Sequence, residues 1–512
     1  MRSELTQKLI NDFGIWKRTV MSDEFEITEV TISEIHEAMR SGEITATALV
    51  DSYIERIEAY DSDINAIVTR NPDARARAKE LDATLETDGV SGLLHGIPLV
   101  VKDQAMTADI TTTFGSELFA EFVPDTDATI VTKLRDAGAI IVAKTAMNDW
   151  AAGSSGISSI VGQTKNPYDL DRDPGGSSSG TGAAVAANLA TVGIGEDTGG
   201  SIRAPSSCCN LFGIRVTTGL VSRSGLSPLV ERHDTPGPMA RTVEDLVRVL
   251  DVITGYDPDD AYTGITSMVE FDSYEQALDD DTLEGARIGV LRDVFGDPED
   301  PDCAPVNDIV ETRLTQLSDV GVELIDVSIP DLETYLDEAS LYEFQANHDI
   351  TAFLQTLEDP PVSSLDEIME LNGYPDKLTS LERMADGYSD PSDHADYWQA
   401  VEAQKQFRDE IMGVFAAQNL DAIAFPDLKI LPRHIDDLPQ DDGERYLINT
   451  LIASYSSCPA ISLPGGVTDD GLPVGIELLG PPLSEDTLLS IASQYEPIAD
   501  PRTPPSTAPP IE

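Results

Sequence analysis

The sequence predicts an α/β protein, and three observations support that fold class. Short apolar runs with the length of buried strands occur along most of the chain, for example at 97–102, 139–144 and 286–291. Segments with helical spacing of apolar residues lie between them, and such alternation is typical of a sheet covered by helices. Apolar residues make up 41% of the 512 residues, which is enough for a large core. No run reaches the ~18 consecutive apolar residues of a membrane helix.

The N-terminal part of the chain is predicted to be helical. Thr31 and Glu34 have the spacing of a capping box, and Gly42 is placed to end the helix that they begin. The stretch SYIERIEAY gives a second helix, and residues 71–85 give a third with a proline near its start. A strand at 97–102, a helix at 127–137 and a strand at 139–144 follow.

The same alternation continues to the end of the chain. We expect a helix at 305–319 and strands at 189–195, 211–217, 286–291, 322–327, 420–428, 460–467 and 472–480. Residues 333–415 are mostly helical in pattern, and we interpret them as a layer beside the sheet. The expected organisation is an N-terminal extension at 1–22, one domain at 23–498 with a helical insertion at about 330–415, and a disordered, proline-rich tail at 499–512.

An extreme acidic charge runs through the whole chain. The sequence has 92 Asp and Glu against 33 Lys and Arg, for a formal net charge of −59. Such a charge excludes nonspecific binding to nucleic acid or anionic membranes, because both need a cationic surface. It also creates self-repulsion that salt screens. Since the acidic residues are not confined to one tail or linker, we interpret the chain as a cytoplasmic protein of a halophile.

The cysteines and histidines show no metal-binding pattern. Cys208 and Cys209 are adjacent, Cys303 and Cys458 are isolated, and no pair of histidines has zinc spacing. We therefore expect reduced thiols, no metal and no cofactor. His233, in the stretch VERHDTPGPM, falls in an expected loop near the serine clusters described next.

Two serine–glycine clusters and one lysine carry the candidate chemistry. Residues 175–203 read GGSSSGTGAAVAANLATVGIGEDTGGSIR and contain Ser177 and Ser201, while Lys102 ends the predicted strand in GIPLVVKD. Serine is a weak nucleophile until a base takes its proton. Lysine can be that base only when burial lowers its pKa. Asp103 should point to the opposite face of the sheet from Lys102. The three residues predict a serine hydrolase that acts on an amide.

The glycines before Ser201 predict a site for a developing oxyanion. Gly199 and Gly200 allow a backbone turn that other residues resist. Amide N–H groups between Asp197 and Ser201 could then point at the negative oxygen of the transition state. A helix that begins at the serine cluster before Gly182 would add the positive end of its dipole.

Other interpretations of these residues compete with catalysis. GGSSSGTG could be a flexible linker, but a helix and a strand follow it directly. A phosphate loop needs G-x-x-x-x-G-K-[ST], which is absent here. Residues 176–180 match G-x-S-x-G with Ser178 as nucleophile, but that motif needs a preceding strand, and YDLDRDP is typical of a loop. Lys102 by itself would be an ordinary strand-end lysine, so its interpretation rests on the two serines.

Long ordered blocks of the sequence resemble the amidase signature family. They are GIPLVVKD, AGAIIVAKTAMNDWAAGSS, TKNPYDLDRDPGGSSSG, EDTGGSIRAP and DTPGPMARTVEDL, and the resemblance covers roughly 96–259, with weaker similarity from 31 and at 421–496. It implies a large mixed β-sheet covered by helices on both faces. The chain departs from the family where relatives often have GLKP, at residues 213–216, and where Asn210 replaces a frequent glycine.

The resemblance also implies roles for individual residues. Ser201 would be the nucleophile, Ser177 a bridging serine that follows a cis peptide bond, and Lys102 the base. The backbone amides of Thr198, Gly199 and Gly200 would form the oxyanion hole. Arg203 would match an arginine near the site. Many relatives form homodimers, so the resemblance leaves that assembly open here.

Three functions follow from the sequence. The first is a stand-alone amidase that hydrolyses a small-molecule carboxamide through an acyl-enzyme. The second is the glutaminase subunit of a glutamyl-tRNA(Gln) amidotransferase, but a segment similar to NLARYDGVRYG, which that subunit carries, is missing here. LYEFQANHDITAFL and NTLIASYSSCPAISLPGG instead resemble the general and peptide-amidase branch. The third is an inactive binding homologue, which the intact Lys102, Ser177 and Ser201 disfavour.

Overall fold

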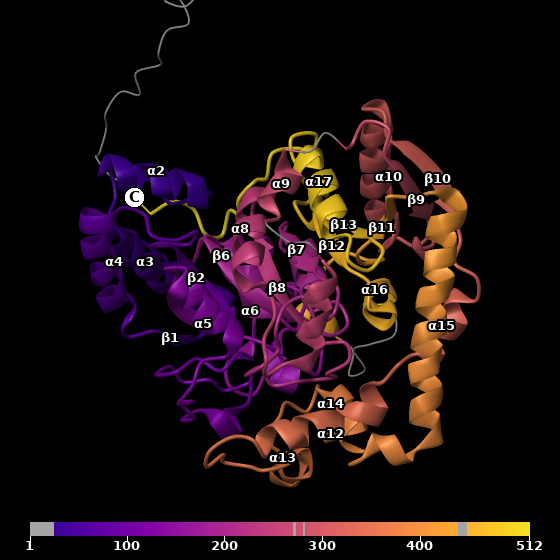
Figure 1. The fold of residues 1–512 in the computed structure, drawn as a ribbon, viewed down its shortest axis with the longest axis horizontal. Coiled ribbons are helices and arrows are strands. Elements are labelled where there is room, and N and C mark those ends of the chain that lie inside the picture. The colour runs from indigo at the N-terminus through magenta and orange to yellow at the C-terminus, as the bar shows by residue number, and fades with distance from the viewer. Residues whose placement is uncertain (1–24, 270–272, 280–281, 439–447, 512) are drawn as a thin grey trace, which may run out of the picture.

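An eleven-stranded sheet forms the centre of the molecule (Figure 1). The computed structural model describes residues 25–269, 273–279, 282–438 and 448–511. The spatial order of the strands is β1-β3-β2-β6-β8-β7-β12-β13-β11-β9-β10. Their bounds are β1 Ile67–Arg70, β2 Pro98–Lys102, β3 Ile140–Thr145, β6 Val192–Asp197, β7 Phe212–Arg215, β8 Thr235–Ala240, β9 Arg287–Leu291, β10 Glu323–Val327, β11 Ala422–Pro426, β12 Ala460–Val467 and β13 Pro473–Leu479. A separate ribbon pairs β4 (Ile157–Ser158) with β5 (Gly162–Gln163).

The sheet is mixed. Strands β3, β2 and β6 run parallel to one another, as do β11, β9 and β10. Between these two groups, neighbouring strands from β6 to β11 pair antiparallel. In β2 and β6, Val101 pairs with Ile194, so the carboxyl ends of both strands reach the same edge of the sheet. Ligand sites of open α/β sheets lie at such edges.

Both faces of the sheet are covered by helices, as the family resemblance implies. In β11, Ala422 and Ala424 belong to one core and Ile423 and Phe425 to another, because side chains alternate between the faces of a strand. The first core includes residues of α8, α10 and α17, and the second includes residues of α15 and α16. The helices are α2 Ile32–Ser41, α3 Ala46–Ile64, α4 Ala74–Asp88, α5 Thr129–Asp136, α6 Ser179–Ala186, α7 Arg203–Cys208, α8 Val243–Ile253, α9 Glu275–Leu278, α10 Ala304–Asp319, α11 Leu332–Glu338, α12 Tyr342–Leu354, α13 Leu365–Leu371, α14 Thr379–Ala385, α15 Ala395–Gln418, α16 Leu451–Ser456 and α17 Glu485–Tyr495.

Local sequence signals fix the ends of the first helix as expected. The Thr31 side chain accepts a hydrogen bond from the Glu34 amide, and the Glu34 carboxylate accepts one from the Thr31 amide. Gly42 ends α2 with φ of 76°, a left-handed conformation that glycine adopts without a steric penalty. These contacts are local along the chain, which is why the sequence alone predicts them.

The segment between β10 and β11 consists largely of helices α11 to α15. Helices α12, α13 and α14 lie together at one end of the molecule, and the long α15 runs along its side (Figure 1). They enclose a small core of their own with aromatic residues from the N-terminal half, among them Phe114, Phe119 and Trp150. This layer also contributes one wall of the cavity described below.

The sequence does not predict strand β8 and indicates a loop there. Its sequence, TPGPMA, has two prolines, and proline removes a donor from the hydrogen-bond ladder of a sheet. In the structure β8 lies between β6 and β7, but its pairing with β7 involves only Met239 and Ala240, and Pro236 and Pro238 lie outside that pairing. The tertiary context therefore overrides the local propensity.

Residues 499–511 of the C-terminal tail are held by contacts, whereas the sequence predicts disorder at 499–512. The Arg56 guanidinium donates to the backbone carbonyls of Ala508 and Pro509 at 2.8 and 2.9 Å. Arg502 donates to the carbonyl of Asn210 at 3.0 Å and forms an ion pair with Glu29. Proline composition predicted disorder, but proline carbonyls still accept hydrogen bonds when a distant arginine reaches them. The expected extension at 1–22 lies outside the described residues.

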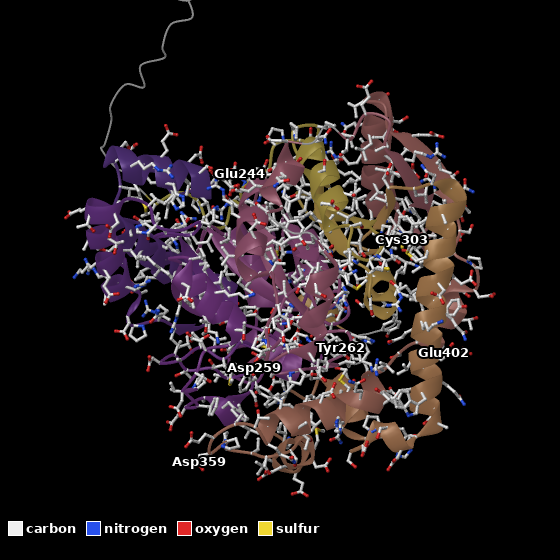
Figure 2. All side chains as sticks on the ribbon, viewed as in Figure 1. Glu244, Asp259, Tyr262, Cys303, Asp359 and Glu402 are labelled. Atoms are coloured by element: carbon white, nitrogen blue, oxygen red, sulfur yellow. The ribbon has the colours of Figure 1, made fainter. Side chains whose placement is uncertain are left out.

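Acidic side chains occur in widely separated parts of the molecule. Glu244 in α8, Glu402 in α15, and Asp259 and Asp359 in loops are distant from one another in Figure 2. The acidic charge is therefore not confined to one segment of the described chain. Within the described ranges, no helix combines the length and apolar character needed to cross a bilayer.

Candidate active site

Lys102 is the last residue of β2, and its side chain is buried at the edge where β2 and β6 end. Its exposed fraction is 1%. The Nζ atom donates to the Ser177 hydroxyl at 2.9 Å and to the Glu196 backbone carbonyl at 3.1 Å, and it lies 3.2 Å from the Glu196 Oε2 atom. Asp103 points the other way and pairs with Lys144 at 3.3 Å, as the strand alternation predicts. Sequence reasoning missed Glu196 as the carboxylate beside the lysine.

Ser177 lies just before α6, after a cis peptide bond with Gly176. The family resemblance implies this cis bond. The Ser177 hydroxyl accepts the hydrogen bond from Lys102, and the side chain is fully buried. The next residue, Ser178, has its hydroxyl bonded to both the carbonyl and the amide of Glu196 at 3.2 Å. A buried hydroxyl in two such bonds fits a structural role, which agrees with rejecting the G-x-S-x-G interpretation.

Ser201 lies in the glycine turn that follows β6, and its side chain borders a cavity. Its carbonyl accepts a hydrogen bond from the amide of Ser178 at 3.3 Å, which connects the two serine clusters. Lys102 and Ser177 are in direct contact, whereas no hydrogen bond joins the hydroxyls of Ser177 and Ser201 within the described part of the chain. The structure thus brings the two clusters and the lysine to one place.

The cavity next to Ser201 has a volume of about 700 Å³. Leu229, Tyr342, Leu451 and Tyr455 give it an apolar side near the serine, and Gly199 borders it as well. Residues of α11 and α14, including Glu333 and Arg383, also line this cavity. A volume of this order accommodates a small organic molecule.

Burial dominates the electrostatics of Lys102. The low-dielectric interior disfavours the ammonium form and lowers the pKa of Lys102 below its ordinary value. The charges of Glu196, Asp234 and Asp197 act in the opposite direction without overcoming burial. Although a carboxylate lies beside Lys102, its neutral form is therefore favoured relative to that of a lysine in water.

The glycine turn leaves only some of the expected amides free to face a negative oxygen. The amide of Gly200 donates to the Asp197 Oδ1 atom at 2.9 Å, so this member of the expected oxyanion hole is already engaged. The amides of Thr198 and Gly199 have no acceptor within the described residues. A Cβ atom at Gly199 would come within 2.1 Å of the Tyr342 hydroxyl, and one at Gly200 within 2.1 Å of the Thr450 Oγ1 atom. A larger residue at either position would have to displace these side chains, and Gly200, with φ of 124°, also has a backbone conformation that other residues rarely adopt.

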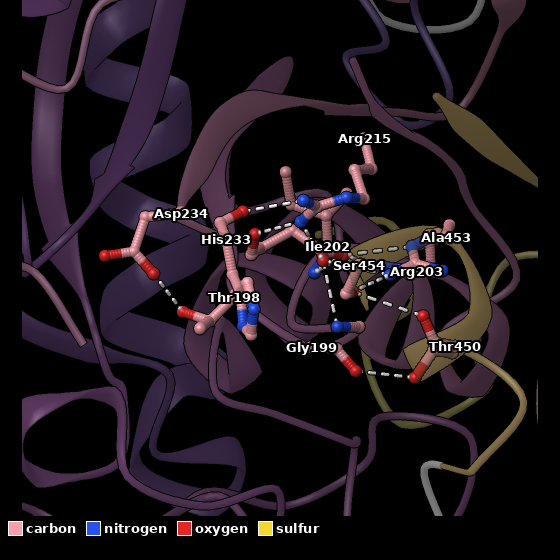
Figure 3. A network of polar contacts seen from close by, with 12 residues as sticks. Thr198, Gly199, Ile202, Arg203, Arg215, His233, Asp234, Thr450, Ala453 and Ser454 are labelled. Carbon is pink, nitrogen blue, oxygen red and sulfur yellow. Dashed lines mark hydrogen bonds and ion pairs between the residues drawn. The ribbon is translucent and has the colours of Figure 1, made fainter. Parts of the chain in front are cut away.

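Asp197 organises the turn through two buried arginines, Arg203 and Arg215, which are labelled in Figure 3. Arg203 and Arg215 each lie 3.0 Å from the Asp197 Oδ1 atom, and all three side chains are fully buried. Burial alone would raise the pKa of Asp197, but the two guanidinium groups hold it well below its ordinary range. Arg215 stands in the segment where the chain departs from its relatives, and its role in this network was not predicted.

Arg203 continues this network toward the C-terminal strands. It pairs with Glu477 on β13 at 2.6 Å. It also donates to the Ser454 hydroxyl at 2.9 Å (Figure 3). Thr450 donates to the carbonyl of Gly199 at 2.6 Å, which fixes the other side of the turn. These contacts give Arg203 a structural role beside the site that the family resemblance implies for it.

His233 does not act as an acid or base in this arrangement. It is fully buried, with its ring 5.3 Å from that of Tyr455 and 5.9 Å from that of Tyr342. Burial, followed by the charges of Arg215 and Arg232, lowers the pKa of His233 to about 3. The imidazole is neutral at physiological pH and packs against the aromatic side of the cavity.

The family model described as Amidase matches residues 48–489, which include every residue of the site described above. The chain belongs to the amidase signature family. The A subunit of glutamyl-tRNA(Gln) amidotransferase from Halorhodospira halophila is 35% identical over 485 residues, covering 92% of this chain and 97% of its own length. An A subunit of the same enzyme from Clostridium acetobutylicum is 32% identical over 488 residues, covering 92% and 99%.

Solved structures of amidase signature proteins have the same fold. The native peptide amidase of Stenotrophomonas maltophilia superposes with a TM-score of 0.83 at 32% identity, covering 94% of this chain and 99% of its own. The glutamyl-tRNA(Gln) amidotransferase A subunit of Thermotoga maritima gives a TM-score of 0.73 at 26% identity, covering 92% and 95%. Membership of this family supports an enzyme of the hydrolase or amidotransferase type.

Proposed function

We propose that this chain is a stand-alone amidase that hydrolyses a carboxamide through an acyl-enzyme. The observation that carries the proposal is the 2.9 Å hydrogen bond from the Lys102 Nζ atom to the Ser177 hydroxyl, in a fully buried position. A lysine whose pKa is lowered by burial can accept a proton from a serine, as an ammonium ion cannot. Ser201, in the glycine turn after β6, borders the cavity and can therefore reach a substrate, whereas Ser177 does not border it.

In the proposed reaction, Ser201 attacks the carbonyl carbon of the amide. Its proton passes to Ser177 as Ser177 gives its own proton to neutral Lys102, and the carbonyl oxygen becomes negative. The same protons return in the opposite direction to the nitrogen of the leaving ammonia or amine, and the acyl group stays on Ser201. A water molecule, deprotonated by the same route, then releases the carboxylic acid and restores the Ser201 hydroxyl.

The backbone amides of Thr198 and Gly199 are the proposed donors to the negative oxygen. They are unengaged among the described residues, whereas the Gly200 amide is held by Asp197. Losing one donor of this kind typically raises the activation barrier by ~2.7–4 kcal/mol. Gly200 would then shape the turn rather than donate, which revises the set of three amides expected from the sequence.

The experiment that tests this function combines a fluorophosphonate probe with an ammonia-release assay over aliphatic, aromatic and peptide amides. We expect the wild-type protein in high salt to be labelled at Ser201 and to release ammonia from at least one class of amide. The Ser201→Ala variant should lose both signals, while Ser267→Ala, in an exposed 3₁₀ helix, should keep both. A folded wild-type protein that neither labels nor hydrolyses any of these amides would contradict the stand-alone amidase.

A second candidate function is the glutaminase subunit of a glutamyl-tRNA(Gln) amidotransferase. It is favoured by the curated relatives, which carry the name of that enzyme at 32–35% identity over nearly their whole length. The higher TM-score to peptide amidase than to the Thermotoga maritima protein favours the stand-alone enzyme. Purification from the native cells distinguishes the two, because a tRNA-binding partner that copurifies and accepts the released ammonia would support the second function.

A further inference from the structure

Two buried carboxyl groups, those of Glu196 and Asp234, lie near Lys102, and the proposed reaction does not use them. Glu196 Oε2 is 3.2 Å from the Lys102 Nζ atom, and Glu196 Oε1 accepts from the Thr198 hydroxyl at 3.2 Å. The same hydroxyl lies 2.6 Å from the Asp234 Oδ1 atom (Figure 3). The exposed fractions of Glu196 and Asp234 are 1% and 3%. One threonine hydroxyl, with a single proton, therefore connects the two acids.

The charges of this cluster do not balance. Lys102, even as an ammonium ion, supplies one positive charge against the two carboxylates. Arg203 and Arg215 do not correct the deficit, because both contact Asp197, and Arg203 also pairs with Glu477. Two ionised carboxylates in so small a buried space repel each other strongly, so one of them keeps its proton. Asp234 is that group. Glu196 contacts the Lys102 amine directly, whereas burial and then the charge of Glu196 raise the pKa of Asp234, although its carboxylate accepts from the amides of Leu229 and Val230.

Both acids border a second cavity, of about 280 Å³. Besides Glu196 and Asp234, its wall includes the charged or titratable residues Arg223, Glu231, His348 and Asp349. Arg223 is paired with Asp260 at 2.6 Å, and the Asp349 carboxylate accepts from the amide of Glu231 at 2.7 Å. Among the described residues none of these groups is bonded to Lys102, and Asp197, on the opposite face of β6, is held by its arginines. Glu196 is thus the carboxylate that contacts the proposed base.

Two further buried polar side chains border the second cavity. Gln104 and Ser227 border it, and each exposes only 1% of its surface. The Gln104 Oε1 and Ser227 Oγ atoms have no hydrogen-bond partner within the described residues. Buried polar atoms without a protein partner are typically satisfied by water. Water in this cavity would let Glu196 and Asp234 exchange protons without passing through the cavity that borders Ser201.

We propose that Glu196 is a positioning residue for the base, and that Asp234 stays protonated beside it. The Glu196 carboxylate and carbonyl together hold the Lys102 amine on the Ser177 hydroxyl. The negative charge of Glu196 also influences the pH at which the Lys102 amine loses its proton. Because Asp234 is uncharged, it does not raise that pH further. This inference rests on the proposed function, because it assigns Glu196 to the base of that reaction.

The test is the pH dependence of kcat/KM and kcat in the Glu196→Gln variant. Activity in the wild type falls at acid pH as Lys102 becomes protonated. An opposite charge within ~4–6 Å typically moves a pKa by ~1–3 units, so removing the Glu196 charge should shift this acid limb down by about one to three pH units. Glu485→Gln is the matched control, since Glu485 is equally buried but accepts from the amide of Thr217. The control should leave the acid limb in place.

Asp234→Asn supplies the second measurement. If Asp234 is already neutral, this variant leaves the acid limb where it is, and difference infrared spectra show the carbonyl band of a protonated carboxylic acid that the variant lacks. A downward shift in Asp234→Asn, or no such band at neutral pH, overturns the assignment of the proton. These readings need no Glu196 variant, so they stand even if Glu196→Gln fails to fold.

The outcomes separate this inference from the proposed function. A folded Glu196→Gln enzyme that hydrolyses amides with an unmoved acid limb overturns the role of Glu196 and leaves the amidase intact. A wild-type protein that shows no hydrolysis and no labelling of Ser201 overturns the amidase itself. A merely structural Glu196 would lower the amount of folded enzyme without moving the pH profile.

Discussion

Glu196 and Asp197 are neighbours at the end of β6, and both are fully buried, yet their surroundings have opposite effects. Asp197 has two arginines at 3.0 Å and accepts several backbone amides, so its charge is compensated. Glu196 has one cationic partner, Lys102, and a second acid, Asp234, lies near it. The difference teaches that burial does not decide ionisation by itself. A fully paired cluster is suited to hold a turn rigidly, whereas an underpaired cluster is suited to exchange protons.

The largest expected effect is the loss of activity when Lys102, which Glu196 contacts, or one of the two serines is replaced. Ser201→Ala and Lys102→Ala should each reduce kcat/KM by about 10³- to 10⁶-fold, and Ser177→Ala by less, because removing a member of a nucleophile–base unit disables the whole unit. Steady-state ammonia release and the melting temperature are the measurements. Retained turnover in Ser201→Ala at an unchanged melting temperature would refute the assignment.

Replacing Asp197, which pairs with two arginines, should mainly lower the free energy of unfolding. Asp197→Asn leaves two buried guanidinium groups without their shared carboxylate, and breaking a buried pair in this way typically costs about 3–5 kcal/mol of unfolding free energy. Asp409→Asn is the matched control, because the exposed Lys405–Asp409 pair is screened by water and should contribute little to stability. Chemical denaturation in high salt measures both. Equal losses in the two variants would show that the Asp197 network is not structural.

Salt should act on the surface and leave the buried clusters largely unaffected. The net charge of −59 repels itself, and the screening length falls from about 10 Å at 0.1 M to about 3 Å at 1 M salt. We expect the melting temperature and the activity to fall when salt is removed, and to recover when it is returned. Sodium chloride titration followed by thermal unfolding is the measurement. Full activity and an unchanged melting temperature in dilute buffer would contradict a halophilic protein.

A smaller effect should appear at Asp349, in the helical layer. Burial raises the pKa of Asp349 to about 7 from an ordinary 3.8, although the hydrogen bond from the Glu231 amide acts in the opposite direction. A raised folded-state pKa contributes stability that is present below pH 3.8 and is lost as the pH rises through about 7. Asp349→Asn should therefore unfold with a weaker pH dependence between those values than the wild type. Identical pH profiles of unfolding free energy would show that Asp349 is not buried as described.

The sequence predicted the elements whose determinants are local. The capping box of Thr31 and Glu34 and the stop at Gly42 involve neighbours in the chain, and the alternation of apolar strands and helices records burial directly. Strand β8 and the C-terminal tail escaped prediction for one common reason. Their proline-rich sequences oppose the observed order, and distant partners supply it, namely the strands on either side of β8 and Arg56 beside the tail.

The site shows the same division. The resemblance pointed to Lys102, Ser177 and Ser201, and the structure joins the first two directly. The acidic pair that ends an otherwise apolar strand, Glu196 and Asp197, was a signal in the sequence for charges near the site. The role of each acid could not be predicted, because the partners that decide it, Asp234, Arg203 and Arg215, come from separate segments of the chain.

By itself, the sequence determined the α/β class, the acidic surface and the residue types of the site, because composition, periodicity and local spacing depend only on chain order. Only the tertiary structure decided which buried charge meets which partner. Electrostatic energy depends on distances through the folded interior, and those distances bring together residues as remote in the chain as Lys102 and Glu196.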